Sequence, residues 1–412
     1  MGALNTPSLR ILLGLVAGLV AGTLLAETTT GTAAAAIAQP VGKLWLDALT
    51  MTVVPLVFSL LVTGVMGAAV HASGAQVAGR ALLWFALLLL AACFLSIGVT
   101  AGILEIWPIP RAAAALASAG GPIPPVPSST DWLANIIPTN PIKSAAETAM
   151  VPVVVFALLF GLAASRIEAE PRTAVSRLAR GIADTMLVIV QWVLWVAPVG
   201  VLALAFGVGQ RLGGSAAGVL AHYVAVVILA CLAAVVLAYG CVAVLGRMNP
   251  LAFARAALPA QIIAVSTQSS LASLPAMVEA APALGVERAR AGVVLPLAVS
   301  LFRMASAAAN VAVAMYLAQV HGVTVAPTTL AIGAVVAALV SVAAVGLPAQ
   351  VSFFAIIAPV CLAMGVPVVL LPLLLAIETL PDVFRTLGNV TADLAAARLA
   401  GREDPSTEAP AD

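Results

Sequence analysis

Six side chains able to bind a charged small molecule lie close together near the end of the chain, within residues 377–394. They are Glu378, Asp382, Arg385, Thr386, Asn389 and Asp393. At about 100° per residue these positions fall within an arc of about 100° on one helix face. The planar Arg fork suits two-point recognition of a carboxylate, and an Asp one turn away can receive an ammonium group. The alternative interpretation is a structural ion pair between Asp382 and Arg385 at i,i+3.

The composition places this polar face inside a membrane protein. The chain has 412 residues, of which 63% are hydrophobic and only 8% are charged, whereas soluble chains carry about 25% charged residues. Apolar stretches of membrane-spanning or nearly spanning length cover residues 9–26, 44–70, 81–104, 150–165, 181–208 and 217–246. Polar residues inside such helices normally face a cavity or a transport pathway. A net charge of +1 gives no electrostatic case for nucleic acid.

The distribution of basic residues predicts the orientation in the membrane. If the N-terminus is cytoplasmic, 12 of the 18 Lys and Arg residues fall inside and four fall outside. We therefore expect a multi-pass protein of the inner (cytoplasmic) membrane with both termini in the cytoplasm. Residues 105–130 are expected to form an exposed loop, and residues 403–412 a cytoplasmic tail. Residues 9–26 are interpreted as a retained first helix, because no cleavage site clearly ends that run.

Two apolar segments are interrupted by polar or helix-breaking residues. Residues 255–285 carry basic residues at both flanks and a hydroxyl-rich centre at 266–275, which predicts a re-entrant hairpin with its tip at depth. Residues 330–364 are broken at 346–352 and are predicted to enter from the opposite side. Two interrupted segments in matching positions indicate an inverted-repeat transporter with a binding site near the midplane.

Several motifs resemble one known family. They are MTVVPLVFSLL at 51–61, PTNP at 138–141, APVG at 197–200, SSLASLP at 269–275, GLP at 346–348, and the polar spacing of residues 382–393. Their number and order are similar to those of the dicarboxylate/amino acid:cation symporter family, the glutamate transporter homologues. The resemblance covers nearly the whole chain.

The resemblance implies an all-α membrane protein with eight transmembrane helices and two re-entrant helical hairpins, working as an elevator-type transporter. Residues 1–80 and 130–215 would form the scaffold of a homotrimer in the lipid bilayer. Residues 81–104 and 216–402 would form the mobile transport domain. Within it, hairpin 1 would span about 255–285, helix 7 about 288–318, hairpin 2 about 330–364 and helix 8 about 366–400.

The resemblance also implies roles for single residues. Asp382 would receive a substrate ammonium, Arg385 would pair with the side-chain carboxylate, and Asn389 would hold the main-chain carboxylate. Thr386 and the hairpin residues Ser269 and Ser270 would support these contacts, and the second hairpin would supply a gate. The gate residues would be Pro348, Ala349 and Gln350. The substrate would be an acidic amino acid (aspartate or glutamate) or a related dicarboxylate, and Asp382 favours the amino acid.

The coupling residues depart from the family pattern. Where the family carries Asn-Met-Asp-Gly-Thr, this chain has Arg303-Met-Ala-Ser-Ala307. At the positions where helix three of the family carries oxygen ligands, this chain has Phe85 and the leucines at 88–89. No metal ligands are assigned, sodium coupling is expected to be lost or weakened, and the candidate coupling ions are H+ and Na+, with no other cofactor. Arg303 is predicted to replace a bound cation beside Glu378 or Asp393. The alternative is that Arg303 only satisfies a carboxylate.

Three further points stay open at this stage. The sequence does not determine whether Arg303 faces Asp393, Glu378 or the substrate. Glu378 stands where acidic members usually have Asp, and it is a candidate proton carrier. The second hairpin lacks the glycines that usually follow its proline, which puts a cation site there in doubt.

Other functions fit the sequence less well. One is a conventional sodium-coupled symporter, which would use backbone carbonyls and Asp393. A channel or a non-transporting binding protein is a further alternative. An enzyme is not expected, because no Ser-His, metal-ligand or paired-Asp constellation lies in the apolar segments.

Overall fold

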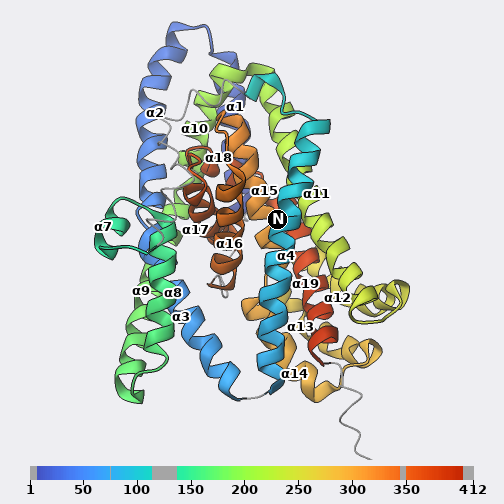
Figure 1. Cartoon of the computed structure of the whole chain (residues 1–412). Helices are drawn as coiled ribbons and strands as arrows, with labels where there is room; N and C mark the ends of the chain where they lie inside the picture. The colour runs from blue at the N-terminus through green and yellow to red at the C-terminus, as the bar shows by residue number, and fades with distance from the viewer. Residues whose placement is uncertain (1–6, 75, 114–136, 344–348, 402–412) are drawn as a thin grey trace, which may run out of the picture.

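The computed structural model describes residues 7–74, 76–113, 137–343 and 349–401. Within these ranges every regular element is helical (Figure 1). Six helical stretches are long and apolar enough to cross a membrane, and four shorter helices are also apolar. This agrees with the predicted class of a helical membrane protein.

One group of helices lies on the left of Figure 1 and extends across its top. It comprises α1 (Pro7–Leu24), α2 (Thr29–Thr50), α3 (Val53–Gly74), α8 (Met150–Ala164), α9 (Ala169–Trp195) and α10 (Ala197–Leu212). Helix α10 packs on α1 and α2, and α3 packs on α8 and α9. These elements belong to the segments predicted as the scaffold.

Glycines allow α1 and α10 to approach closely. Gly14, Gly18 and Gly22 recur every fourth residue on α1, and a Cβ added at each would collide with a backbone carbonyl of α10. Small residues at this spacing let membrane helices pack backbone to backbone. At the next contact, Trp45 of α2 packs on Gly200 and its indole N–H donates to the Val193 carbonyl at 2.8 Å.

Replacing Gly18 with alanine is therefore expected to lower the thermal unfolding temperature of the purified protein. The added methyl would meet the Leu202 carbonyl and Ala205, and such overpacking costs about 1–3 kcal/mol. The matched control is Gly240→Ala on α11 (Ala216–Val244), where an added Cβ meets nothing within 4 Å. That control should be neutral or stabilising, as helical Gly→Ala usually is. Equal effects at both positions would contradict the close contact.

A second group of helices surrounds the polar C-terminal helix, α19 (Thr379–Gly401). Helix α19 packs against α4 (Gln76–Ile106), α11, α14 (Arg288–Leu301) and α15 (Met304–Val320). In Figure 1 most of these elements lie on the right-hand side. The predicted polar face therefore looks into protein rather than lipid.

Two helix pairs occupy the positions of the predicted hairpins. Helix α12 (Pro250–Thr267) packs against α13 (Ser270–Ala280), and the turn between them places Gln268 in the left-handed conformation. Helix α16 (Pro327–Ala343) packs against α17 (Ala349–Ala363). The tip of this second pair, residues 344–348, lies outside the described residues.

Two segments predicted as single helices are interrupted. In the first, α14 ends at Leu301. Phe302 is extended and Arg303 is also non-helical (φ -120°, ψ 64°) before α15 begins. The second consists of α18 (Leu371–Leu375), a short turn, and α19. Pro381 lies in the first turn of α19 and accounts for the second break, because a proline lacks the backbone N–H and its ring disfavours a preceding helical turn. Glu378 consequently lies in the turn before α19, and its carbonyl accepts from the Asp382 amide at 2.9 Å.

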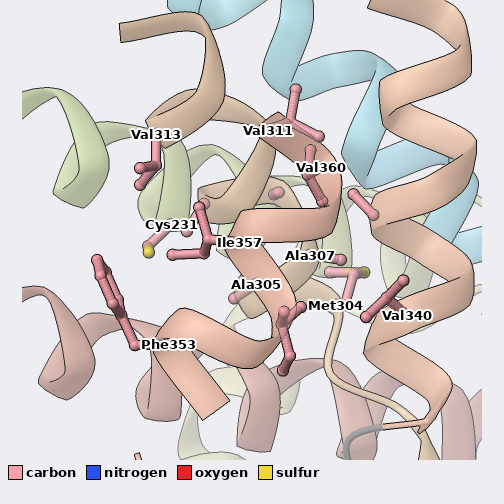
Figure 2. Close-up of a cluster of buried hydrophobic side chains, with 14 of the residues drawn as sticks. Cys231, Met304, Ala305, Ala307, Val311, Val313, Val340, Phe353, Ile357 and Val360 are labelled. Atoms are coloured by element: carbon pink, nitrogen blue, oxygen red, sulfur yellow. The ribbon is translucent and has the colours of Figure 1, made fainter. Parts of the chain in front are cut away.

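An apolar core holds α15 in place. Its residues Met304, Val311 and Val313 are buried with Val340 of α16 and with α17 side chains such as Ile357 (Figure 2). All of these side chains are at most 4% exposed. Burial of this kind is worth roughly 1.5–3 kcal/mol for each large apolar side chain. Helix α15 is thus fixed as a support for the polar side chains that face α19.

Candidate functional site

The polar site is built where the broken segment α14–α15 meets α19. Asn389 of α19 accepts hydrogen bonds from the Ala305 and Ser306 amides at 3.0 and 3.2 Å, and its Nδ2 donates to the Ser306 hydroxyl at 2.9 Å. Arg303, the residue preceding α15, provides no side-chain cap. Asn389 therefore satisfies N–H groups that a helix start leaves open. The amide predicted to hold a substrate carboxylate is used here to stabilise the start of α15.

Arg385 lies at the centre of the site with its side chain almost completely buried. Its Nε forms an ion pair with Glu378 Oε1 at 2.6 Å, and both side chains are no more than 7% exposed. Its Nη1 donates to the Asn310 side-chain oxygen at 2.7 Å and to the Ser306 carbonyl at 3.3 Å. The guanidinium plane is thus fixed from two sides, as precise carboxylate recognition requires.

A tyrosine from α11 completes this ion pair. Tyr223 is fully buried and its hydroxyl donates to Glu378 Oε2 at 3.3 Å. Both oxygens of Glu378 are therefore engaged, one by Arg385 and one by Tyr223. A buried pair of this kind depends on such additional hydrogen bonds, because desolvation of the two charges is costly.

Three further charged side chains, Arg303, Asp382 and Asp393, belong to the site. Arg303 lies close enough to Asp382 and Asp393 for its charge to interact with both carboxylates. Asp393 has no exposed surface, and neither of its carboxylate oxygens has a hydrogen-bond partner in the described part of the chain. A carboxylate so placed is stabilised only by a nearby cation or by taking up a proton. Thr386, also buried, lies next to Arg385 on the same helix.

Aromatic rings fill the space between α4 and the break before α15. Phe85 stacks on Phe302 with ring centroids 4.8 Å apart and planes 12° apart. Both rings are buried, as are Leu88 and Leu89 one turn further along α4. Sodium needs converging oxygen ligands, and these four side chains offer none.

Of the predicted hairpin residues, Ser269 and Ser270 have described side chains, and neither takes part in the contacts given above. Ser269 caps α13 by accepting from the Ala272 amide at 3.2 Å, and Ser270 is the first residue of that helix. Ala349 and Gln350 begin α17, and Pro348 lies outside the described residues. The contribution of both hairpin tips to substrate binding stays a prediction.

Three site residues were not singled out by the sequence: Tyr223, Ser306 and Asn310. Ser306 and Asn310 are spaced i,i+4 and share the α15 face that meets α19. The sequence did contain a signal for Asn310, because its side-chain amide stands among Ala and Val residues of an apolar helix. No comparable signal marked Tyr223, because its relation to Glu378 spans 155 residues of sequence.

Together these features define a class of protein. A bundle of apolar helices contains two helix pairs, two interrupted helices and a cluster of three carboxylates and two guanidinium groups that are buried or partly buried. This is the architecture of a membrane carrier for a small charged solute.

Comparison with known proteins gives the family. The model of the sodium:dicarboxylate symporter family matches residues 8–402. The chain therefore belongs to the sodium:dicarboxylate symporter family, as the sequence motifs predicted.

Several characterised relatives are similar over most of their length. The proton/glutamate-aspartate symporter of Escherichia coli (strain K12) is 27% identical over 86% of this chain and 82% of its own length. The proton/sodium-glutamate symport protein of Bacillus caldotenax is 26% identical over 94% and 92%. A C4-dicarboxylate transport protein of Rhizobium etli is 26% identical over 95% and 88%.

Proposed function

We propose that this protein is a secondary active transporter of acidic amino acids, aspartate or glutamate, or of related C4-dicarboxylates. The observation that carries the proposal is the buried Arg385, whose guanidinium is fixed by Glu378, Asn310 and Ser306 while Nη2 has no partner in the described part of the chain. A buried cationic donor of this kind suits a carboxylate ligand. The relatives named above are symporters or transport proteins for such compounds.

The proposal includes the architecture expected from the family. Eight transmembrane helices and two hairpins would form an elevator-type carrier in the inner membrane, with both termini cytoplasmic. Three copies would assemble through the scaffold helices. In support of two bodies, α10 packs mainly on α1 and α2, and α3 packs mainly on α8 and α9, whereas α4, α11, α14 and α15 surround α19. The contacts of α3 with α4 and α16 would form the surface along which the two bodies move.

Sodium coupling is proposed to be lost or weakened, with Arg303 replacing a bound cation. The stacked Phe85 and Phe302 rings support this, because they occupy the region where oxygen ligands were expected. Arg303 carries a permanent positive charge beside Asp382 and Asp393. In a low-dielectric interior such a charge strongly disfavours a second cation nearby.

A proton on Glu378 is proposed to couple to substrate binding. Glu378 holds Arg385 at 2.6 Å, so an incoming carboxylate must compete with an anion already in contact with the guanidinium. Protonation of Glu378 removes that competition. The other charged or titratable groups near this pair are Asp382, Cys231 and Tyr223, with Arg303 interacting with Asp382.

Uptake into proteoliposomes tests the proposal. The purified protein should catalyse saturable counterflow of labelled aspartate in sodium-free buffer, and an inward proton gradient should accelerate net uptake. Glu378→Gln, which mimics the protonated side chain, should retain counterflow but lose most of the acceleration by the proton gradient. Strict dependence on sodium at neutral pH would contradict the sodium-independent mechanism, and absence of saturable counterflow would favour a channel or a binding protein.

A conventional sodium-coupled symporter is the second candidate. The specific observation in its favour is Asp393, whose fully buried carboxylate has no hydrogen-bond partner in the described residues and would suit a cation. The same uptake assay separates the two mechanisms, because sodium-coupled transport would stop when sodium is replaced by choline.

A further inference from the structure

Asn310 of α15 helps to fix Arg385 through its side-chain oxygen, but the proposed mechanism does not use its NH2 group. It is 2% exposed, and its side-chain oxygen accepts from Arg385 Nη1 at 2.7 Å. Its Nδ2 group is buried and has no hydrogen-bond partner in the part of the chain that the structure describes. Leaving a buried donor unpaired is unfavourable, so a native protein normally retains one only for a purpose.

The hydrogen bonds of Arg385 determine which of its donors stay open. Nε faces Glu378, and Nη1 uses its two hydrogens on Ser306 and Asn310. Nη2 is left without a partner among the described residues. The open donors of this cluster are therefore Arg385 Nη2 and Asn310 Nδ2, carried by two side chains in direct contact.

A purely structural role for Asn310 would not require an amide. The Ser306 carbonyl, one helical turn away, accepts one hydrogen of Nη1, and holding the other hydrogen needs only an acceptor oxygen. The amide adds a donor that finds no acceptor among the described residues. Both neighbours of Asn310 in sequence, Ala309 and Val311, are fully buried and apolar.

We propose that Asn310 is a specificity-determining residue that binds the terminal carboxylate of the substrate together with Arg385. One carboxylate oxygen accepts from Arg385 Nη2 and the other from Asn310 Nδ2. This inference rests on the proposed transport of acidic substrates, and it adds the means by which the site separates an acid from its amide. A terminal carboxamide offers one oxygen and one NH2 group, so its NH2 group would face a donor and be rejected.

The test compares matched substrates that differ only in this terminal group. Aspartate and asparagine form one pair, and succinate and succinamate form the other. Their affinities would be measured by competition against labelled aspartate bound to the purified protein. Asn310→Ala should weaken aspartate and succinate by about 10- to 100-fold, the expected loss of one hydrogen bond to a charged group. Asparagine and succinamate should change little, so discrimination between acid and amide should collapse.

Asn310→Asp provides a second, nearly isosteric variant that keeps an acceptor for Arg385. It replaces the Nδ2 donor with an oxygen, so the preference should invert and asparagine should bind more tightly than it does to the natural protein. Thr100→Val is the control, because Thr100 is a buried polar residue of α4 that lies outside these contacts and should leave both affinities unchanged.

The outcomes separate this inference from the proposed function. If the natural protein binds none of the four compounds, the proposal that it transports acidic substrates is wrong. If it binds the acids but the Asn310 variants weaken acids and amides equally, or change neither, the specificity role of Asn310 is wrong while the proposed function stands.

Discussion

Arg385→Ala is expected to reduce the binding of aspartate, glutamate and C4-dicarboxylates by at least about 100-fold, whichever ion is coupled. The substitution removes the guanidinium and also leaves Glu378 as a buried carboxylate with only Tyr223 as a partner. Breaking one side of a buried charge pair costs about 3–5 kcal/mol. Equilibrium binding of labelled aspartate to the purified protein measures the loss of affinity.

Three companion variants identify the cause of the loss. Arg385→Lys keeps the charge but cannot span Glu378 and Asn310, so it should also bind weakly. Arg385→Ala combined with Glu378→Gln removes the unpaired charge and should restore thermal stability without restoring binding. Arg177→Ala changes an exposed arginine of α9 and serves as the control. Near-normal affinity in the double variant would show that Arg385 is a structural residue and not a substrate contact.

Arg303→Asn is expected to make transport respond to sodium. The substitution removes a positive charge that interacts with Asp382 and Asp393, so the fully buried Asp393 and the partly buried Asp382 would need another cation. We expect slower aspartate uptake in sodium-free buffer and a several-fold stimulation when sodium is added. Arg303→Lys keeps the charge and is the matched control, for which sodium should have no effect.

Adding Ala305→Asp should strengthen the response to sodium by supplying a third carboxylate. Ala305 is fully buried and its Cβ lies directly against Gly388 of α19, so this second substitution is expected to lower stability as well. The single and double variants must therefore be compared at equal amounts of folded protein. If both transport as before and ignore sodium, Arg303 does not replace a cation and serves only to balance a carboxylate.

The sequence by itself determined the class of the protein and the elements that carry its site. Low charge and long apolar stretches allow only a membrane environment, because charged side chains in lipid are costly. The helical period placed Asp382, Arg385, Asn389 and Asp393 on one face, since spacing along a single helix is a local property. The family followed from the order of short motifs. Pro381 could also have indicated that α19 begins close to Glu378.

The tertiary structure decided which partners these residues meet. Arg385 and Asn310 are 75 residues apart, and Tyr223 and Glu378 are 155 residues apart. Such pairs depend on how whole helices pack, which no local pattern records. The break before α15 illustrates this, because no glycine or proline stands at Phe302 or Arg303 and the amides that follow are satisfied by Asn389 from another helix. Periodicity thus identified the polar face. Packing determined that Arg385 is held by Glu378 and Asn310 and that the charge of Arg303 interacts with those of Asp382 and Asp393.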